Sequence, residues 1–198
     1  FVKSTPLAVS IDISSTEITD TSSLKSIPTL RSLSIGESKV RDLDPISEMR
    51  TLERLDAAFS DLVDIGPLSS LSNLKVLLLD VKAETDLSPL ANLRSLKELM
   101  LLGLSNDPPT DDRSLNLEAL QNLTDLESLT VTRVPLVDLS PIGKMENIAR
   151  LNLSTTYVED IVPLSGLNYL EILNLEKSSV LDLSPLAKLA NLKDLGKV

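Results

Sequence analysis

The chain of 198 residues contains neither cysteine nor histidine. Without cysteine there can be no disulfides, no thiolate metal sites and no thiol nucleophile. Without histidine the chain lacks the commonest general base and the commonest metal-binding side chain. It also has no glycine-rich phosphate loop. The residues therefore point away from catalysis, and we expect no cofactor, no metal site and no small-molecule substrate.

Aromatic side chains and positive charge are also scarce. Aromatic residues make up 2% of the chain, although 42% of it is hydrophobic, so the apolar residues are mostly leucine, isoleucine and valine. The formal net charge of -10 disfavours a nucleic-acid partner, because binding one would bring like charges together. No apolar run approaches the ~18 residues that a membrane span needs. No secretory signal peptide is recognisable either.

What the chain has in abundance is one repeated pattern. It recurs every 22 residues, with a single interval of 30, and its consensus is L-x-x-L-x-L-x-x-(S/T)-x-V-x-D-L-x-P-L-x-x-L-x-x. We interpret residues 1–198 as one domain of about eight repeats, with a partial repeat from residue 192 and an insertion at 105–113. The repeats start near residues 8, 30, 52, 74, 96, 126, 148 and 170.

Each repeat divides into two halves with different apolar spacing. The first half alternates apolar and polar residues, as in Leu151-Asn152-Leu153, which is typical of a short strand. The second half spaces its apolar residues by three and begins with proline, which predicts a short 3-10 turn. The repeats must stack, because one repeat alone cannot bury its leucines. The pattern predicts an α/β solenoid of leucine-rich repeats, a right-handed arc with a parallel concave sheet and short 3-10 turns on the convex side.

An aspartate recurs at position 13 in seven repeats, and an asparagine takes its place in the remaining one. A side-chain oxygen there can accept hydrogen bonds from free backbone N–H groups where the 3-10 turn begins. The regular recurrence favours this structural role over acid–base chemistry. The residues are Asp20, Asp42, Asp64, Asp86, Asn116, Asp138, Asp160 and Asp182.

The 22-residue repeat with D-L-x-P-L resembles the leucine-rich repeats of bacterial internalins over residues 8–195, and less closely those of a eukaryotic phosphatase regulatory subunit. The internalin resemblance implies a curved solenoid that binds a protein partner, often a host receptor, on its concave face. It also implies a bacterial protein that is secreted or at the cell surface and acts in virulence. The residues themselves are equally consistent with a place inside the cell.

The chain departs from the internalin pattern in three ways. Position 9, usually asparagine in internalins, is serine or threonine in most repeats but reads Lys82, Leu104 and Val134 in the middle three. No helical cap precedes Ala8, and the chain begins at Phe1 and ends at Val198 in the middle of a strand pattern. We expect this chain to be part of a longer protein.

The outward positions of the predicted strands (positions 3, 5, 7 and 8 of each repeat) suggest where a partner binds. Most of them are polar, whereas neighbouring repeats carry the apolar residues Phe59, Val76, Leu78, Val81, Met100 and Leu102. An exposed apolar patch with a polar rim is typical of a protein-binding site. The predicted rim comprises Arg54, Asp56, Asp80, Glu98 and Arg133, and Arg150 is a further predicted binding residue on the polar flank.

The insertion at 105–113 follows this patch and leaves two interpretations open. The insertion either frames an interface or folds over the patch, so that Leu78, Met100 and Leu102 become a local core. Its aspartates, Asp107, Asp111 and Asp112, match no calcium loop.

Two functions from different classes fit this sequence. The first is a protein-recognition module that binds on its concave face. The second is the substrate-targeting part of a larger secreted effector enzyme whose catalytic domain lies outside these residues.

Overall fold

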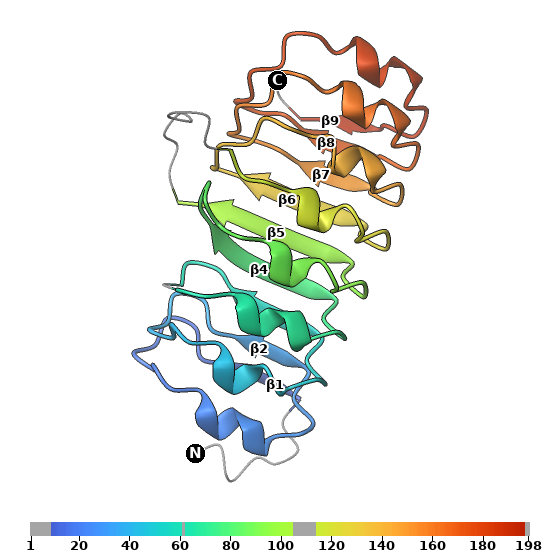
Figure 1. Ribbon diagram of the computed structural model, residues 1–198. Coiled ribbons are helices and arrows are strands. Elements are labelled where there is room, and N and C mark those ends of the chain that lie inside the picture. The colour runs from blue at the N-terminus through green and yellow to red at the C-terminus, as the bar shows by residue number, and fades with distance from the viewer. Residues whose placement is uncertain (1–8, 61, 105–113, 197–198) are drawn as a thin grey trace.

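The leucine-rich pattern folds into a single curved sheet backed by short turns. The computed structural model describes residues 9–60, 62–104 and 114–196. Over these residues nine parallel strands pair in strict chain order along the arc (Figure 1). The strands are β1 (Ser10–Asp12), β2 (Ser32–Ser34), β3 (Arg54–Ala57), β4 (Val76–Val81), β5 (Glu98–Gly103), β6 (Ser128–Thr132), β7 (Arg150–Asn152), β8 (Ile172–Asn174) and β9 (Asp194–Leu195).

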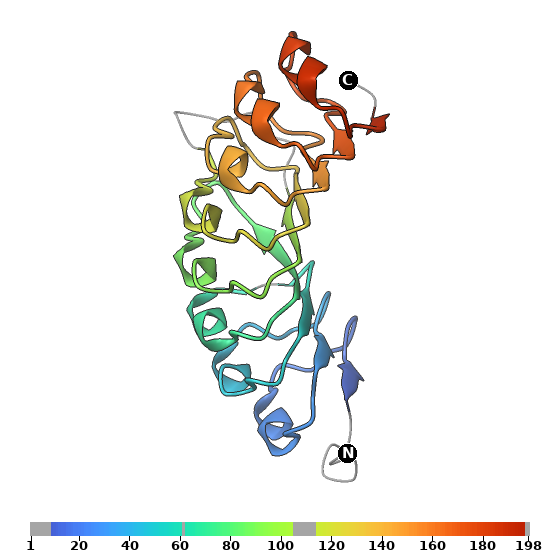
Figure 2. The same ribbon diagram turned by 90° about the vertical axis from the view of Figure 1, so that its right-hand side faces the viewer.

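Each of the first eight strands is followed by one 3-10 helix on the opposite side of the solenoid. Figure 2 shows the sheet on the inside of the curve and these helices on the outside. The predicted leucine-rich-repeat arc is therefore confirmed. The helices are η2 (Ser22–Ser26), η3 (Asp44–Ile46), η4 (Gly66–Ser70), η5 (Ser88–Leu90), η6 (Glu118–Leu120), η7 (Ile142–Lys144), η8 (Val162–Gly166) and η9 (Ser184–Lys188).

The core lies between the sheet and the 3-10 helices and is built from stacked aliphatic columns. Leu33, Leu55, Leu77 and Leu99 pair in register across β2 to β5, and none of their surface is exposed. Dispersion and hydrophobic burial between equal side chains therefore recur at each step along the arc. This repetition explains why a chain almost without aromatic residues can fill its core.

The recurrent acidic column has the structural role that the sequence predicts. In all eight turns the side-chain Oδ1 atom accepts the backbone N–H two residues later, at 2.8 Å. At Asp20 and Asp138 the hydroxyl of the serine two residues later, followed by its N–H, lowers the pKa of the carboxyl group. At Asp86 and Asp182 the backbone N–H and then the hydroxyl lower the pKa in the same way.

These shifts predict that acid destabilises the solenoid through its turns. A carboxyl group whose pKa is lower in the folded chain stabilises the fold above its unfolded pKa, and this contribution is lost as pH falls through the folded pKa. The ordinary value for these groups is 3.8. We expect the free energy of unfolding, measured by urea titration, to fall as pH drops below about 4.

The chain itself provides a control for this acid effect. Asn116 occupies the same position and accepts the same bond without a titratable proton. A variant with Asp20→Asn, Asp86→Asn, Asp138→Asn and Asp182→Asn should keep the turns and show a shallower loss of stability in acid. An equally steep loss in this variant would assign the acid sensitivity to other carboxyl groups.

Candidate functional site

The concave face is the outward surface of the sheet, and it is mostly polar toward both ends, with the exposed Ile172 on β8 as an exception, and apolar in the middle. Leu78 on β4 and Met100 on β5 pair in register, with Asp56 and Thr130 as their next neighbours along the same row. Val76, Leu78, Met100 and Leu102 are each partly exposed. Phe59 is 52% exposed directly after β3. These five side chains form what we call the concave apolar patch.

Val81 does not belong to this patch, and its predicted outward orientation is wrong. Its side chain is 2% exposed and packs in the hydrophobic core. In six repeats the residue at this position turns the chain out of the strand with a positive φ, as Phe59 does at 56°. β4 instead continues through Val81, so the alternation of the strand directs this side chain inward.

Two side-chain bonds end the strands in the other repeats. An aspartate or asparagine at position 5 accepts the N–H of position 7, as Asp12, Asp56, Asn152 and Asn174 do at 2.9–3.2 Å. In four repeats a serine or threonine at position 9 also donates its hydroxyl to the carbonyl of position 6, whereas the buried hydroxyl of Ser178 makes no hydrogen bond among the described residues. The four donors are Thr16, Ser38, Ser60 and Thr156, at 2.5–2.6 Å. Such local bonds compete with the strand for backbone groups.

Apart from Phe59, the apolar patch lies in repeats where both of these bonds are missing. The repeats that contain β4, β5 and β6 have neither residue type at the two positions, and these strands are 6, 6 and 5 residues long. Strands β1, β2, β3, β7 and β8, in repeats with at least one of the bonds, have 3 or 4 residues. The longer strands thus share the loss of both bonds, and in β4 and β5 the residue that replaces Asp or Asn at position 5 is also apolar.

The predicted rim residues and Arg150 lie around the patch in different ways. Arg54 and Asp56 approach each other to 3.9 Å across one face of β3. Asp80 accepts the backbone N–H of Ser60 at 2.9 Å, so it links two repeats as well as facing the patch. Glu98 begins β5 beside Val76, and Arg150 lies two strands further along, exposed on β7.

Part of the patch lines a hollow in the concave face, which we call the concave hollow. It encloses about 440 Å³, and Phe59, Met100, Leu102 and the predicted rim residue Arg133 line it. The other side chains in its lining are polar and were not predicted from the sequence, although Lys177 shares position 8 with Phe59 and Arg133. These missed residues are Thr130, Thr132, Asn152, Ser154, Thr155, Glu176 and Lys177.

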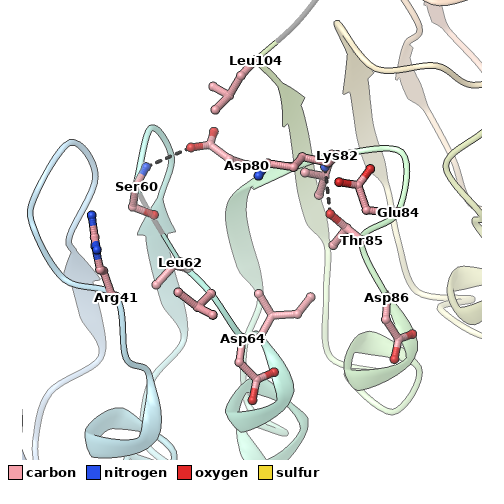
Figure 3. Close-up of a pocket in the computed structure, with 13 residues that line it drawn as sticks. Arg41, Ser60, Leu62, Asp64, Asp80, Lys82, Glu84, Thr85, Asp86 and Leu104 are labelled. Atoms are coloured by element: carbon pink, nitrogen blue, oxygen red, sulfur yellow. Dashed lines mark hydrogen bonds between the residues drawn. The ribbon is translucent and has the colours of Figure 1, made fainter. Parts of the chain in front are cut away.

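A second hollow, of about 620 Å³, opens on the side of the solenoid between the repeats of β3 and β4 (Figure 3). Leu62, Ile65 and Val81 supply apolar walls, and Lys82 and Glu84 come from the turn after β4. Position 11 holds a buried aliphatic side chain at Val40, Leu136 and Val158, but the exposed Glu84 takes this position here. The hollow therefore lies where one aliphatic column is interrupted.

Restoring that column should stabilise the fold. Glu84→Leu is expected to raise the free energy of unfolding by about 1 kcal/mol, because the new side chain can pack on Leu62 and Val81. Thermal melting would measure the gain. Glu146→Leu, at an exposed position outside the hollow, removes the same charge and controls for the acidity of the chain. Equal melting temperatures for the two variants would show that leucine does not fill the hollow.

Several predictions concern residues outside the described ranges. The insertion at 105–113, with Asp107, Asp111 and Asp112, is one of them, and the start of the first repeat at Ala8 is another. Within the described ranges no group of three or more acidic residues could hold a metal ion. None of the helices there is long and apolar enough to cross a membrane.

The fold agrees with solved structures of leucine-rich-repeat proteins, whereas no family model and no curated protein matches the chain. Internalin C2 of Listeria monocytogenes is 24% identical with a TM-score of 0.81, and the match covers 94% of this chain and 79% of that one. Internalin F of the same species is 22% identical with a TM-score of 0.63, over 92% of this chain and 72% of that one.

A third similar structure comes from a plant. The ectodomain of the receptor kinase GASSHO1/SCHENGEN3 from Arabidopsis thaliana, in complex with CASPARIAN STRIP INTEGRITY FACTOR 2, is 19% identical with a TM-score of 0.67. That match covers 89% of this chain but 22% of the plant chain. The resemblance to internalin repeats is thus confirmed in three dimensions, and the chain has the leucine-rich-repeat solenoid fold that these proteins share.

Proposed function

We propose that this chain is a protein-recognition module that binds a partner protein through the concave apolar patch. The observation that carries the proposal is the in-register pair Leu78 and Met100, which lies partly exposed in the middle of a mostly polar face. An exposed apolar patch rimmed by polar residues is typical of a protein-interaction site. The plant receptor ectodomain described above also has a bound partner, which supports recognition as a use of this fold.

The electrostatics favour a protein over a nucleic acid as this partner. The chain has 29 acidic and 19 basic residues, so a phosphate backbone would be repelled overall. Within the described residues many cations are also neutralised by neighbours, as Lys75 is by Glu53 at 2.7 Å. A secreted or surface location, implied by the resemblance to internalins, is part of the same proposal.

The accessibility of the patch can be tested with a hydrophobic dye such as ANS, whose fluorescence rises on apolar surfaces. We expect the unmodified chain to bind the dye and the Leu78→Asp, Met100→Asp double variant to lose most of the signal. Ser10→Asp with Ser34→Asp, at outward positions of β1 and β2, is the matched control because it adds the same charge to the concave face outside both the patch and the hollow.

A deletion of residues 105–113 separates the two interpretations of the insertion. If the unmodified chain binds no dye and the deletion variant binds it strongly, the insertion covers the patch and the proposed interface is wrong. If both bind the dye and the double variant does not, the patch is open and available to a partner.

A further inference from the structure

The lining of the concave hollow changes from apolar to cationic along the arc. Phe59, Met100 and Leu102 come from the repeats of β3 and β5, whereas Arg133 and Lys177 come from the repeats of β6 and β8. Hydroxyl-bearing residues from the repeats of β6 and β7 complete the lining, namely Thr130, Thr132, Ser154 and Thr155. One carboxylate, Glu176, is also present, which leaves one net positive charge in the lining of a hollow in a chain whose net charge is -10.

The cations at this end are available to a partner. Arg133, Arg150 and Lys177 are exposed, and among the described residues none of them forms an ion pair. Elsewhere cations such as Lys97 and Lys193 contact carboxylates of neighbouring repeats at 3.2 and 2.9 Å. On the concave face beyond β5, Arg133, Arg150 and Lys177 therefore carry positive charge without an ion-pair partner among the described residues.

The opposite end of the patch has the reverse charge. Asp56, Asp80 and Glu98 lie around its β3 to β5 side, and Arg54, the cation on β3, is already near Asp56. A partner segment therefore meets carboxylates on one side of the apolar patch and free cations on the other. Such an arrangement selects both the charge and the direction of the bound segment.

We infer that the partner presents an apolar side chain next to carboxylates, with the apolar group on Met100 and Leu102 and the carboxylates facing Arg133 and Lys177. This inference rests on the proposed function, since it describes the partner of the same concave face. Arginine and the surrounding hydroxyls can all donate hydrogen bonds to a carboxylate. The apolar contact supplies affinity, and the charges supply specificity.

Synthetic peptides labelled with a fluorophore test the inference by anisotropy. The acidic probe is Ac-Gly-Leu-Phe-Gly-Ser-Asp-Glu-Asp-amide. An uncharged probe replaces the acids with Asn-Gln-Asn, and a basic probe replaces them with Lys-Arg-Lys. We expect the acidic probe to bind about tenfold more tightly than the uncharged probe at low salt, and this advantage to shrink at about 0.5 M salt through screening.

A charge-reversed variant assigns this advantage to the two cations. Arg133→Glu with Lys177→Glu should abolish the preference for the acidic probe while leaving the uncharged probe bound. Glutamate suits the backbone here, because Glu37 has the same left-handed φ of 55° at position 8 of its own repeat. Lys39→Glu with Lys188→Glu changes the net charge equally at exposed sites outside the hollow and should preserve the preference.

The outcomes distinguish this inference from the proposed function. If all three probes bind equally, or if the Arg133→Glu, Lys177→Glu variant keeps the acidic preference, the charge assignment is wrong. The concave interface would still stand in that case, provided that Leu78→Asp with Met100→Asp abolishes binding of every probe. If none of the probes binds the unmodified chain, both the inference and the apolar interface are contradicted.

Discussion

Gly103→Ala is expected to lower the free energy of unfolding by about 3 kcal/mol or more, because the added methyl group meets backbone atoms rather than a movable side chain. A Cβ atom at Gly103 would lie 1.7 Å from the carbonyl oxygen of Arg133 and 2.9 Å from the backbone nitrogen of Val134. The repeats of β5 and β6 would have to separate to accept it. Urea unfolding would measure the loss.

Gly166→Ala is the matched control for this substitution. No atom lies within 4 Å of a Cβ placed at Gly166, at the end of η8. Alanine there should leave the stability unchanged within about 0.5 kcal/mol or raise it slightly, because it reduces the freedom of the unfolded chain. If both variants were equally stable, the close approach of the two repeats at Gly103 would not exist in solution.

Leu99→Asp is expected to unfold the middle of the solenoid, whereas Met100→Asp at the next position should leave it folded. Leu99 has no exposed surface, so aspartate there would leave an unpaired charge in the core and remove a large apolar contact. We expect a loss of about 4 kcal/mol or more. The Met100 side chain instead points toward the concave face, where a new carboxylate remains in contact with water.

Circular dichroism during thermal melting would compare these two variants. A Leu99→Asp chain that melts as the unmodified chain does would contradict the assignment of this side chain to the core. A Met100→Asp chain that fails to fold would show that this residue is part of the core. Met100→Asp could then no longer test the interface, because a loss of binding would follow from unfolding.

The sequence predicted the fold because the physical constraints repeat. A leucine column with a period of 22 residues has to stack on itself, and Asp20 and its equivalents need no partner beyond their own turn. The outward orientation of Leu78 and Met100 was predictable for the same reason, since a strand alternates its faces. Both inferences require only the pattern of residues within a single repeat.

Side chains that depart from the repeat, or that act together across several repeats, are harder to predict. Position 8 faces outward in regular repeats, which predicts Val81 at the surface, but Leu78 and Lys82 leave β4 without the two bonds that end other strands, so β4 runs on through Val81. Lys177 was missed because the concave hollow joins side chains from several repeats. Which side chains share a hollow depends on curvature and strand length, and no single repeat contains that information.

Because the strands differ in length, we expect the free energy of local unfolding to be higher in the middle of the solenoid than at its C-terminal end. β4 and β5 pair at six positions, whereas β8 and β9 pair at two. Because each strand pairs only with the next along the chain, fraying can begin at an end and proceed inward without disturbing the middle. Backbone amides of β5 should therefore exchange with deuterium last. A partner that binds at β5 contacts a backbone that is already well ordered, so little conformational entropy is lost on binding.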